Sequence, residues 1–237
     1  MRPVDKGKKP EQKFKKYGEA TPVLEKRIGS YCSYCEFPIK HVPELEHVVS
    51  KTKGGEVNDW DNFLLGCKYC NTRKNDEIDL KKRDDYLWPH EYNTFMAYTY
   101  ANGIPKVSKN NIGKDIIEKA ENLFDLVQLD HIPKPGEKDK RFKERHETMN
   151  NANESRAAWE RYSNMQETAE IRALKEGWLE QTINLAKEKG FFSIWMEAFQ
   201  DISLIRNRLI DAFTGTNRKC FDSDGNAKWW CKDDDSD

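Results

Sequence analysis

The sequence predicts an α+β fold, in which a small strand–strand–helix unit is followed by a mainly α-helical region. Two Cys-x-x-Cys pairs, Cys32/Cys35 and Cys67/Cys70, enclose the first unit. Two short apolar runs between the pairs flank a Gly-Gly turn, as the strands of a hairpin do. From about residue 112, apolar residues recur instead with the 3.6-residue period of an amphipathic helix.

The four cysteines of these pairs are the ligands that a tetrahedral zinc site needs. Each pair presents two sulfurs from a tight turn, and four soft thiolates complete the coordination shell. A complete shell leaves no position for water, so we expect this zinc to be structural and not catalytic. The 31 residues between Cys35 and Cys67 exceed the spacing of a plain zinc ribbon, so further structure is expected between the pairs.

The segment between the pairs is predicted to form two strands. Residues 43–50 give a short strand, residues 53–55 a turn, and residues 62–66 a second strand. A helix is expected from Cys70 to about Leu80. The unit therefore has the order ββα, with zinc at its base.

The same segment carries Glu46-His47, an Asn-Phe-Leu-Leu run that starts at Asn62, and Asn71 directly after the last cysteine. This pattern resembles the HNH endonuclease family, which has a ββα-metal fold. The first His of the family motif falls on His47, the central Asn on Asn62, and the last position on Asn71, an Asn in place of His. The resemblance implies a metal-dependent enzyme that hydrolyses DNA phosphodiester bonds.

Looser motifs extend the resemblance to one subgroup of this family. Residues 1–4, 31–36, 190–196, 212–215 and 220–222 are similar to the HNH nuclease subunit of Septu-type anti-phage defence systems. That similarity implies a role in antiviral defence, phage or other foreign DNA as the substrate, and an ABC-like ATPase as the partner that controls cleavage.

His47 is the expected general base, because imidazole titrates near the working pH and can take a proton from water. A lone histidine in a strand is more often structural, but this one lies inside the zinc frame beside a carboxylate. His41 is the next candidate for the base. Asn62 matches the family position that holds the loop of the base through amide hydrogen bonds, so its expected role is orientation.

Glu46 and Asn71 are expected to hold the catalytic divalent ion. Both offer oxygen ligands, which favour Mg²⁺ or Mn²⁺ over zinc. Adjacent residues of a regular strand point to opposite faces, so the strand has to end or twist at 46–47 for Glu46 to share a site with the base. Lys74, or its rival Arg73, is a candidate phosphate contact; a solvated helix face is the alternative for both.

The composition is that of a polar but foldable protein of 237 residues, with 34% charged and 37% apolar residues. It contains no long uncharged apolar stretch and no apolar signal region, so we expect no membrane segment and a cytoplasmic location, where thiols stay reduced. The formal net charge of −1 is unusual for a DNA-binding protein and indicates that the isolated chain grips DNA weakly.

Four segments are predicted: a basic N-terminal arm and short helix (1–30), an HNH nuclease module with the Cys₄ zinc site (31–100), a helical domain (101–216) and an acidic tail (217–237). Residues 1–31 hold nine Lys/Arg against four Asp/Glu. The arm is therefore predicted to be flexible and to contact the DNA backbone or order on a partner, with a solvated tail as the alternative.

The helical domain carries no chemical motif and is expected to dock the ATPase. A long helical pattern covers residues 154–189, with Gly177 as a candidate break and Gly190 as a C-terminal cap. In the tail, the adjacent Trp229 and Trp230 are candidate anchors for a partner. Cys220 and Cys231 have no histidine nearby, so a second zinc is not expected there.

These observations favour a metal-dependent HNH endonuclease that acts on DNA within an ATPase-regulated defence complex. Two alternatives stay open. One is a non-catalytic zinc module that serves as an adaptor on the ATPase. The other is an RNA-directed nuclease, because chemistry at the phosphate does not read the base.

Overall fold

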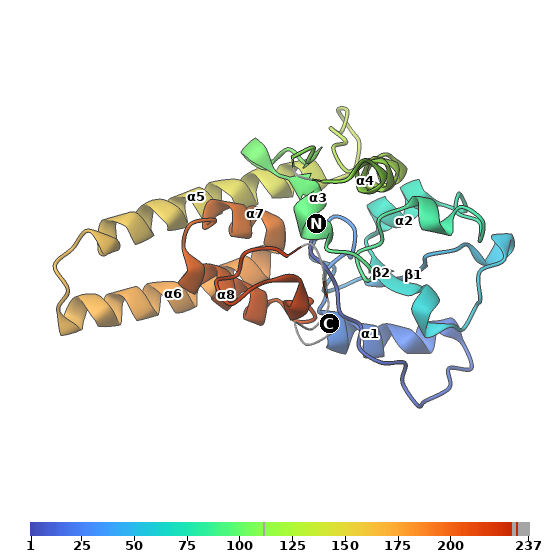
Figure 1. Ribbon diagram of the computed structural model, residues 1–237, viewed down its shortest axis with the longest axis horizontal. Helices are drawn as coiled ribbons and strands as arrows, with labels where there is room; N and C mark the ends of the chain where they lie inside the picture. The colour runs from blue at the N-terminus through green and yellow to red at the C-terminus, as the bar shows by residue number, and fades with distance from the viewer. Residues whose placement is uncertain (111, 229–230, 232–237) are drawn as a thin grey trace.

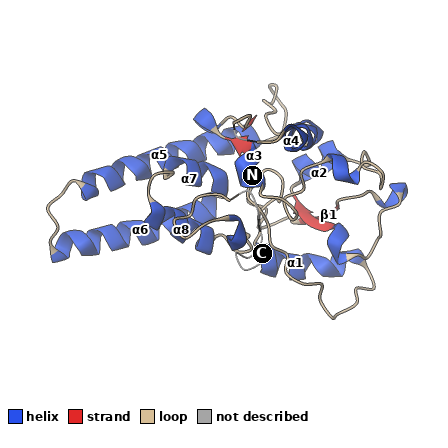
Figure 2. Ribbon diagram, viewed as in Figure 1, coloured by secondary structure: helices blue, strands red, loops and turns tan. Residues whose placement is uncertain are grey.

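The structure is a computed structural model, and it describes residues 1–110, 112–228 and 231. Figure 1 shows a module with a short hairpin and small helices at one end, and a long helical hairpin that extends from the other. Helices predominate and the strands are short, as Figure 2 shows. Over the described residues, no helix combines the length and the apolar character that crossing a bilayer requires.

The elements follow one another in an order that agrees with the α+β prediction. They are α1 (Thr21–Ile28), β1 (Glu44–His47), β2 (Phe63–Gly66), α2 (Lys68–Lys74), α3 (Thr94–Ala97), β3 (Tyr98–Thr99), β4 (Lys106–Val107), α4 (Lys114–Leu126), α5 (Arg141–Ser163), α6 (Ala169–Lys189), α7 (Phe192–Ala198) and α8 (Ser203–Ala212). Single 3₁₀ turns connect them, among them Tyr17–Ala20 and Lys51–Lys53.

The predicted ββα unit is formed by β1, β2 and α2. The two strands pair antiparallel, with Glu44 opposite Gly66 and His47 opposite Phe63. Gly66 leaves room for a neighbour, because a Cβ at this position would lie 3.4 Å from the side chain of Glu46. Helix α2 ends at Lys74 and not near Leu80, because Asn75 adopts a positive φ of 43° that does not continue a helix.

Of the first six residues all but Asp5 are buried, so they do not form a flexible arm. Arg2 is buried and donates to the carbonyl oxygens of Thr214 at 2.6 Å and Ile28 at 2.7 Å. The buried Lys6 ammonium donates to the carbonyl oxygens of Trp60 at 2.8 Å and Phe63 at 3.0 Å. These two cations satisfy carbonyl groups inside the protein, so they cannot contact a DNA backbone. The prediction of a flexible arm is wrong for this part of the segment.

The helical region is built on an antiparallel pair, α5 and α6, whose outer ends lie far from the rest of the chain (Figure 1). Trp159 of α5 packs on Trp178 of α6 with ring centroids 5.2 Å apart. Gly177 does not break α6, which continues to Lys189. Gly190 ends this helix with φ 72°, as the sequence predicts, and a Cβ there would lie 2.8 Å from the carbonyl oxygen of Glu36.

Module and helical region are joined by a buried contact between Glu36 and the start of α7. Glu36 directly follows Cys35, and its carboxylate accepts from the Ser193 backbone N–H at 2.9 Å and the Ser193 hydroxyl at 2.6 Å. It also lies 3.6 Å from the backbone nitrogen of Met1. The Phe191 N–H donates to the Glu36 carbonyl at 3.0 Å. The two parts therefore share one core.

The predicted acidic tail (217–237) begins as an ordered turn. Phe221 bridges to Ala227, and Cys220 forms a disulfide with Cys231, a pairing that the sequence analysis did not predict. The side-chain amide of Asn93 donates to the Cys220 carbonyl at 2.9 Å. Trp229 and Trp230, the candidate partner anchors, lie outside the described residues.

Replacing Glu36 should destabilise the whole fold. We expect Glu36→Ala to lower the free energy of unfolding by about 1.5–3 kcal/mol, because the buried Ser193 donors lose a charged acceptor. Urea denaturation, followed by circular dichroism, measures this change. Glu188→Ala is the control, since the Glu188 side chain is 70% exposed and pairs only with Lys40 at the surface. Equal free energies of unfolding for the two variants would contradict a stabilising role of the Glu36–Ser193 contact.

Candidate functional site

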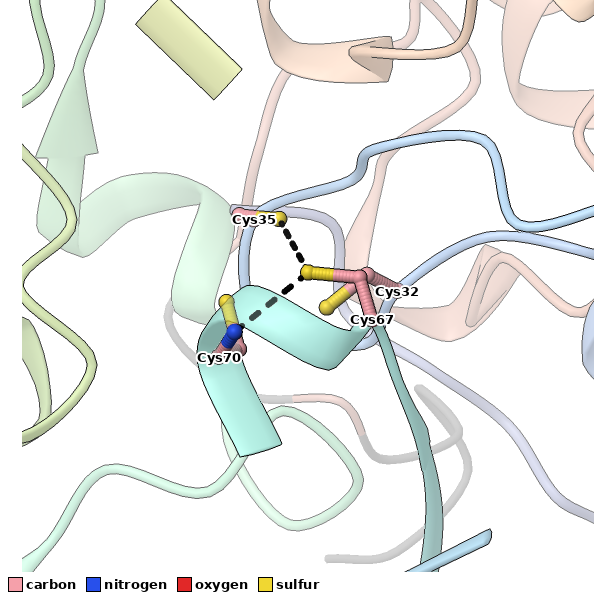
Figure 3. Close-up of side chains that lie close together, drawn as sticks. All are labelled: Cys32, Cys35, Cys67 and Cys70. Atoms are coloured by element: carbon pink, nitrogen blue, oxygen red, sulfur yellow. Dashed lines mark hydrogen bonds between the residues drawn. The ribbon is translucent and has the colours of Figure 1, made fainter. Parts of the chain in front are cut away.

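The four cysteines of the two Cys-x-x-Cys pairs converge as a zinc site requires (Figure 3). Their sulfur atoms all lie within 4.8 Å of one another, and all four side chains are buried. The Cys35 and Cys67 sulfurs are 3.6 Å apart, close to the separation of about 3.8 Å that tetrahedral Zn–S bonds of about 2.3 Å give. Cys67 also caps α2, because its sulfur accepts from the Cys70 N–H at 3.4 Å.

The surroundings of the cysteines fit a zinc ion with four thiolates, which carries a net charge of about −2. Helix α5 places two fully buried arginines beside them. The guanidinium of Arg141 donates to the Cys70 sulfur at 3.4 Å. All three side-chain nitrogens of Arg145 are buried and have no hydrogen-bond partner among the described residues. A buried cation without a partner is costly, so an anionic group belongs nearby. Zinc bound here would crosslink the module.

His47 is the last residue of β1, and its ring lies between Tyr17 and Phe63 with centroids 5.2 Å from each. Its Nε2–H donates to the Val57 carbonyl at 3.0 Å, a partner that can only accept. The proton is therefore assigned to Nε2, which leaves a lone pair on Nδ1. Among the described residues no group hydrogen-bonds Nδ1, so this atom can accept a proton.

Burial lowers the pKa of His47 below its ordinary value of 6.5, with the hydrogen bond to Val57 opposing and the charges of Lys51 and Lys74 adding to the effect. The neutral imidazole is the form that acts as a base. At neutral pH His47 is therefore in the required state.

Asn62 holds the loop that carries Val57. Its Oδ1 accepts from the Val49 N–H at 2.8 Å, and its Nδ2 donates to the carbonyls of Val49 and Glu56 at 3.1 Å each. The side chain is 8% exposed. This geometry agrees with an orienting amide, and the catalytic role of Asn62 stays a prediction.

Glu46 is 3% exposed and is bound by two partners inside the module. The Lys74 ammonium lies 2.7 Å from its carboxylate, and the Tyr34 hydroxyl donates to it. Burial raises the pKa of Glu46, and both partners oppose this shift. Because Glu46 and His47 are adjacent in a regular strand, their side chains point to opposite faces. A metal ion held by Glu46 would have to compete with Lys74 and Tyr34.

Lys74 does not face solvent, so neither the predicted phosphate contact nor the solvated helix face describes it. The side chain is 1% exposed, and its ammonium also donates to the His47 carbonyl at 2.7 Å. Arg73, the rival candidate, pairs with Asp139 at 3.2 Å and Glu137 at 3.4 Å on the segment before α5. Each cation is therefore paired with a buried carboxylate, Lys74 with Glu46 and Arg73 with Asp139, and breaking such a pair would leave a buried charge without a partner.

Asn71 meets Glu44, a residue that the sequence analysis did not name. Its Nδ2 donates to the Glu44 carboxylate at 2.7 Å, and both side chains are half-buried. Glu44 and Glu46 lie on the same face of β1, because strand residues two apart do so. This alternation was the signal that could have found Glu44. The Glu44 carboxylate and the Asn71 amide oxygen are adjacent oxygen donors of the kind that Mg²⁺ and Mn²⁺ prefer.

Comparisons with known proteins give one match, and this match is confined to the ββα module. Residues 32–77 match the family model of HNH endonuclease, so this segment has the sequence pattern of an HNH endonuclease domain. The match covers both cysteine pairs, β1, β2 and α2. Neither the search of curated proteins nor the search of solved structures found a match.

Losing one cysteine ligand should unfold the module. We expect Cys67→Ser to lose zinc and to expose the core, because structural zinc contributes at least about 10 kcal/mol in small zinc domains, as much as a whole domain's stability. Elemental analysis of the parent should give one zinc per chain. Cys220→Ser is the control, because Cys220 belongs to the disulfide and not to this cluster. Folded parent protein that contains no zinc would contradict the assignment.

Proposed function

We propose that this protein is a metal-dependent endonuclease that hydrolyses DNA phosphodiester bonds with His47 as the general base. The observation that carries the proposal is the position of His47 in an HNH domain, with Nε2–H tied to the Val57 carbonyl and Nδ1 left to accept a proton. In the proposed reaction, Nδ1 takes a proton from water while the water oxygen attacks phosphorus and the 3′ oxygen leaves. Asn62 keeps the Val57 carbonyl in place for this step.

A divalent ion is part of the proposal. Asn71, Glu44 and Glu46 would hold Mg²⁺ or Mn²⁺, which would stabilise charge on the phosphate and the leaving oxygen. Because Glu44 and Glu46 lie on the face of β1 opposite to His47, the proposal requires one phosphate to reach both faces at the end of the strand, where His47 is the last residue. Glu44 and Asn71 already contact each other, whereas Glu46 is bound by Lys74 and Tyr34. We therefore extend the predicted pair of ligands to include Glu44.

The cellular role is proposed from motif similarity alone. The motifs shared with Septu-type HNH subunits support cleavage of phage or foreign DNA in the cytoplasm, with an ABC-like ATPase docked on the helical domain. The exposed hydrophobic side chains of Met165, Leu174 and Leu204 lie in or beside α6 and α8. They are the candidate contacts for such a partner.

The decisive experiment compares His47→Ala with the parent on plasmid DNA, with Mg²⁺ or Mn²⁺ present. We expect cleavage to fall about 10²–10⁴-fold while folding and zinc content stay unchanged, as for loss of a general base. His41→Ala is the control, because His41 is exposed and lies outside β1. Parent-like cleavage by His47→Ala would place the base elsewhere.

The same assay separates the alternatives. A chelator that removes Mg²⁺ or Mn²⁺ but spares the Cys₄ zinc should abolish cleavage by the parent. Preference for RNA over DNA would favour the RNA-directed nuclease. Absence of cleavage in the parent, even with the ATPase and nucleotide added, would favour the adaptor.

A further inference from the structure

Two residues near His47, Tyr17 and Lys51, have no role in the proposed function so far. The Tyr17 ring meets the imidazole edge-on, at a centroid distance of 5.2 Å. The Lys51 ammonium lies over the Tyr17 ring, 4.3 Å from its centroid. Tyr17 belongs to the N-terminal segment, outside the matched domain, and Lys51 belongs to the 3₁₀ turn that follows β1.

Of the cationic side chains considered near His47, Lys51 pairs with no acidic residue among the described residues. Arg73 pairs with the buried carboxylate of Asp139, and Lys74 pairs with that of Glu46. The Lys51 side chain is exposed and forms no ion pair with any described residue, and its charge contributes to the lowered pKa of His47. Its contact with Tyr17 is a cation–π interaction, which restricts an otherwise flexible lysine to the neighbourhood of the imidazole.

The N-terminal segment adds more positive charge on the same side of the module. It is placed there by Tyr17 on His47 and by Phe14, whose ring stacks on Trp60 at 6.4 Å. Lys13, Lys15 and Lys16 are exposed, and their ammonium groups pair with no carboxylate among the described residues. Part of the basic segment is therefore held beside the base, although the protein as a whole has a net charge of −1.

We propose that Lys51, positioned by Tyr17, binds the phosphate at or next to the scissile bond, and that Lys13, Lys15 and Lys16 continue this contact along the nucleic-acid backbone. The inference rests on the proposed nuclease function and names the residues with which that site holds its substrate. A fixed cation beside the attacking water stabilises the negative charge that develops on the phosphate. Tyr17 is a positioning residue, because it acts through Lys51 and His47.

Lys51→Ala and Lys53→Ala form a matched pair of variants for the test. Both lysines are exposed in the same 3₁₀ turn, but the Lys53 ammonium donates a hydrogen bond to the Glu77 carbonyl oxygen at 3.4 Å. We expect Lys51→Ala to reduce plasmid cleavage at least 10-fold, and Lys53→Ala to cleave as the parent does. In binding to a DNA duplex, measured in a His47→Ala background, loss of one phosphate contact should reduce the salt slope by about 0.9.

Tyr17 provides a second readout. Tyr17→Phe keeps the ring and should keep the activity. Tyr17→Ala removes the ring that positions Lys51 and should therefore reduce plasmid cleavage, as Lys51→Ala does. Equal cleavage and equal salt slopes for Lys51→Ala, Lys53→Ala and the parent would overturn the inference. In that case a loss of cleavage in His47→Ala would leave the proposed function standing. Parent-like cleavage by His47→Ala would instead overturn both.

A separate observation concerns the buried arginines of α5. Arg145 is 0% exposed, and its three side-chain nitrogens lack partners among the described residues, whereas Arg141 on the preceding turn also binds Asp139. Burial lowers the pKa of Arg145, and the nearby Cys35 opposes this shift most strongly. The two arginines are four residues apart, so they share the face of α5 that meets the cysteines.

We infer that Arg141 and Arg145 supply the counter-charge for the zinc-bound thiolates, so that the helical domain helps to retain the metal of the module. Groups that contact metal ligands commonly change metal affinity when they are replaced. Arg141 shares its charge between Asp139 and Cys70, whereas Arg145 pairs with no carboxylate among the described residues, so the two guanidinium groups together offset part of the negative charge of the site. Removing α5 from the module would leave this negative charge buried and unbalanced.

The test is zinc retention by Arg145→Met against a competing chelator. We expect zinc affinity to fall about 10–100-fold, and Arg145→Lys to restore part of it because the charge is kept. Arg156→Met is the control on the same helix, because Arg156 pairs with Asp201 at 2.8 Å near the surface. A variant Arg145→Met that loses thermal stability but holds zinc as tightly as the parent would show a packing role only, and would overturn the inference.

Discussion

The convergence of four cysteine sulfurs within 4.8 Å of one another is the constraint on which the rest of the structure depends. One pair precedes β1 and the other begins α2, so a metal bound here fixes both ends of the ββα unit. Glu36, next to Cys35, accepts from Ser193 of α7, and Arg141 of α5 donates to Cys70. These two contacts between the module and the helical region therefore lie within one residue of the clustered cysteines.

Buried charged side chains also hold the residues of the candidate site in place. Lys74 is paired with Glu46 beneath β1 and donates to the His47 carbonyl, which holds the end of the strand where His47 lies. A buried ion pair of this kind is costly to break, because the remaining charge loses its partner. His47 is kept neutral by burial, and its Nε2–H is fixed by the loop that Asn62 holds. His47 and the residues that hold it thus come from neighbouring parts of one small module.

The sequence predicted the elements of the module well and the contacts between its side chains poorly. Spacing alone predicted the cysteine cluster, the hairpin and a helix after the second pair, although α2 ends about six residues before the predicted end, because ligand pairs and local periodicity are properties of neighbouring residues. It did not place Lys74 under Glu46, which is 28 positions earlier in the chain, or Arg2 against Thr214. Which face of a helix is buried depends on partners distant in sequence. Glu44 was missed although strand alternation already put it beside Glu46.

The central claim is that a neutral His47 with a lowered pKa takes the proton from water. The most direct measurement is the single-turnover rate of DNA cleavage as a function of pH at saturating Mg²⁺. Because the protonated imidazole cannot act as a base, the rate should fall in acid with an apparent pKa below 6.5 and should be level from about pH 7 upward. A rate that continues to rise between pH 7 and 9 would contradict this account, since another group would then provide the base.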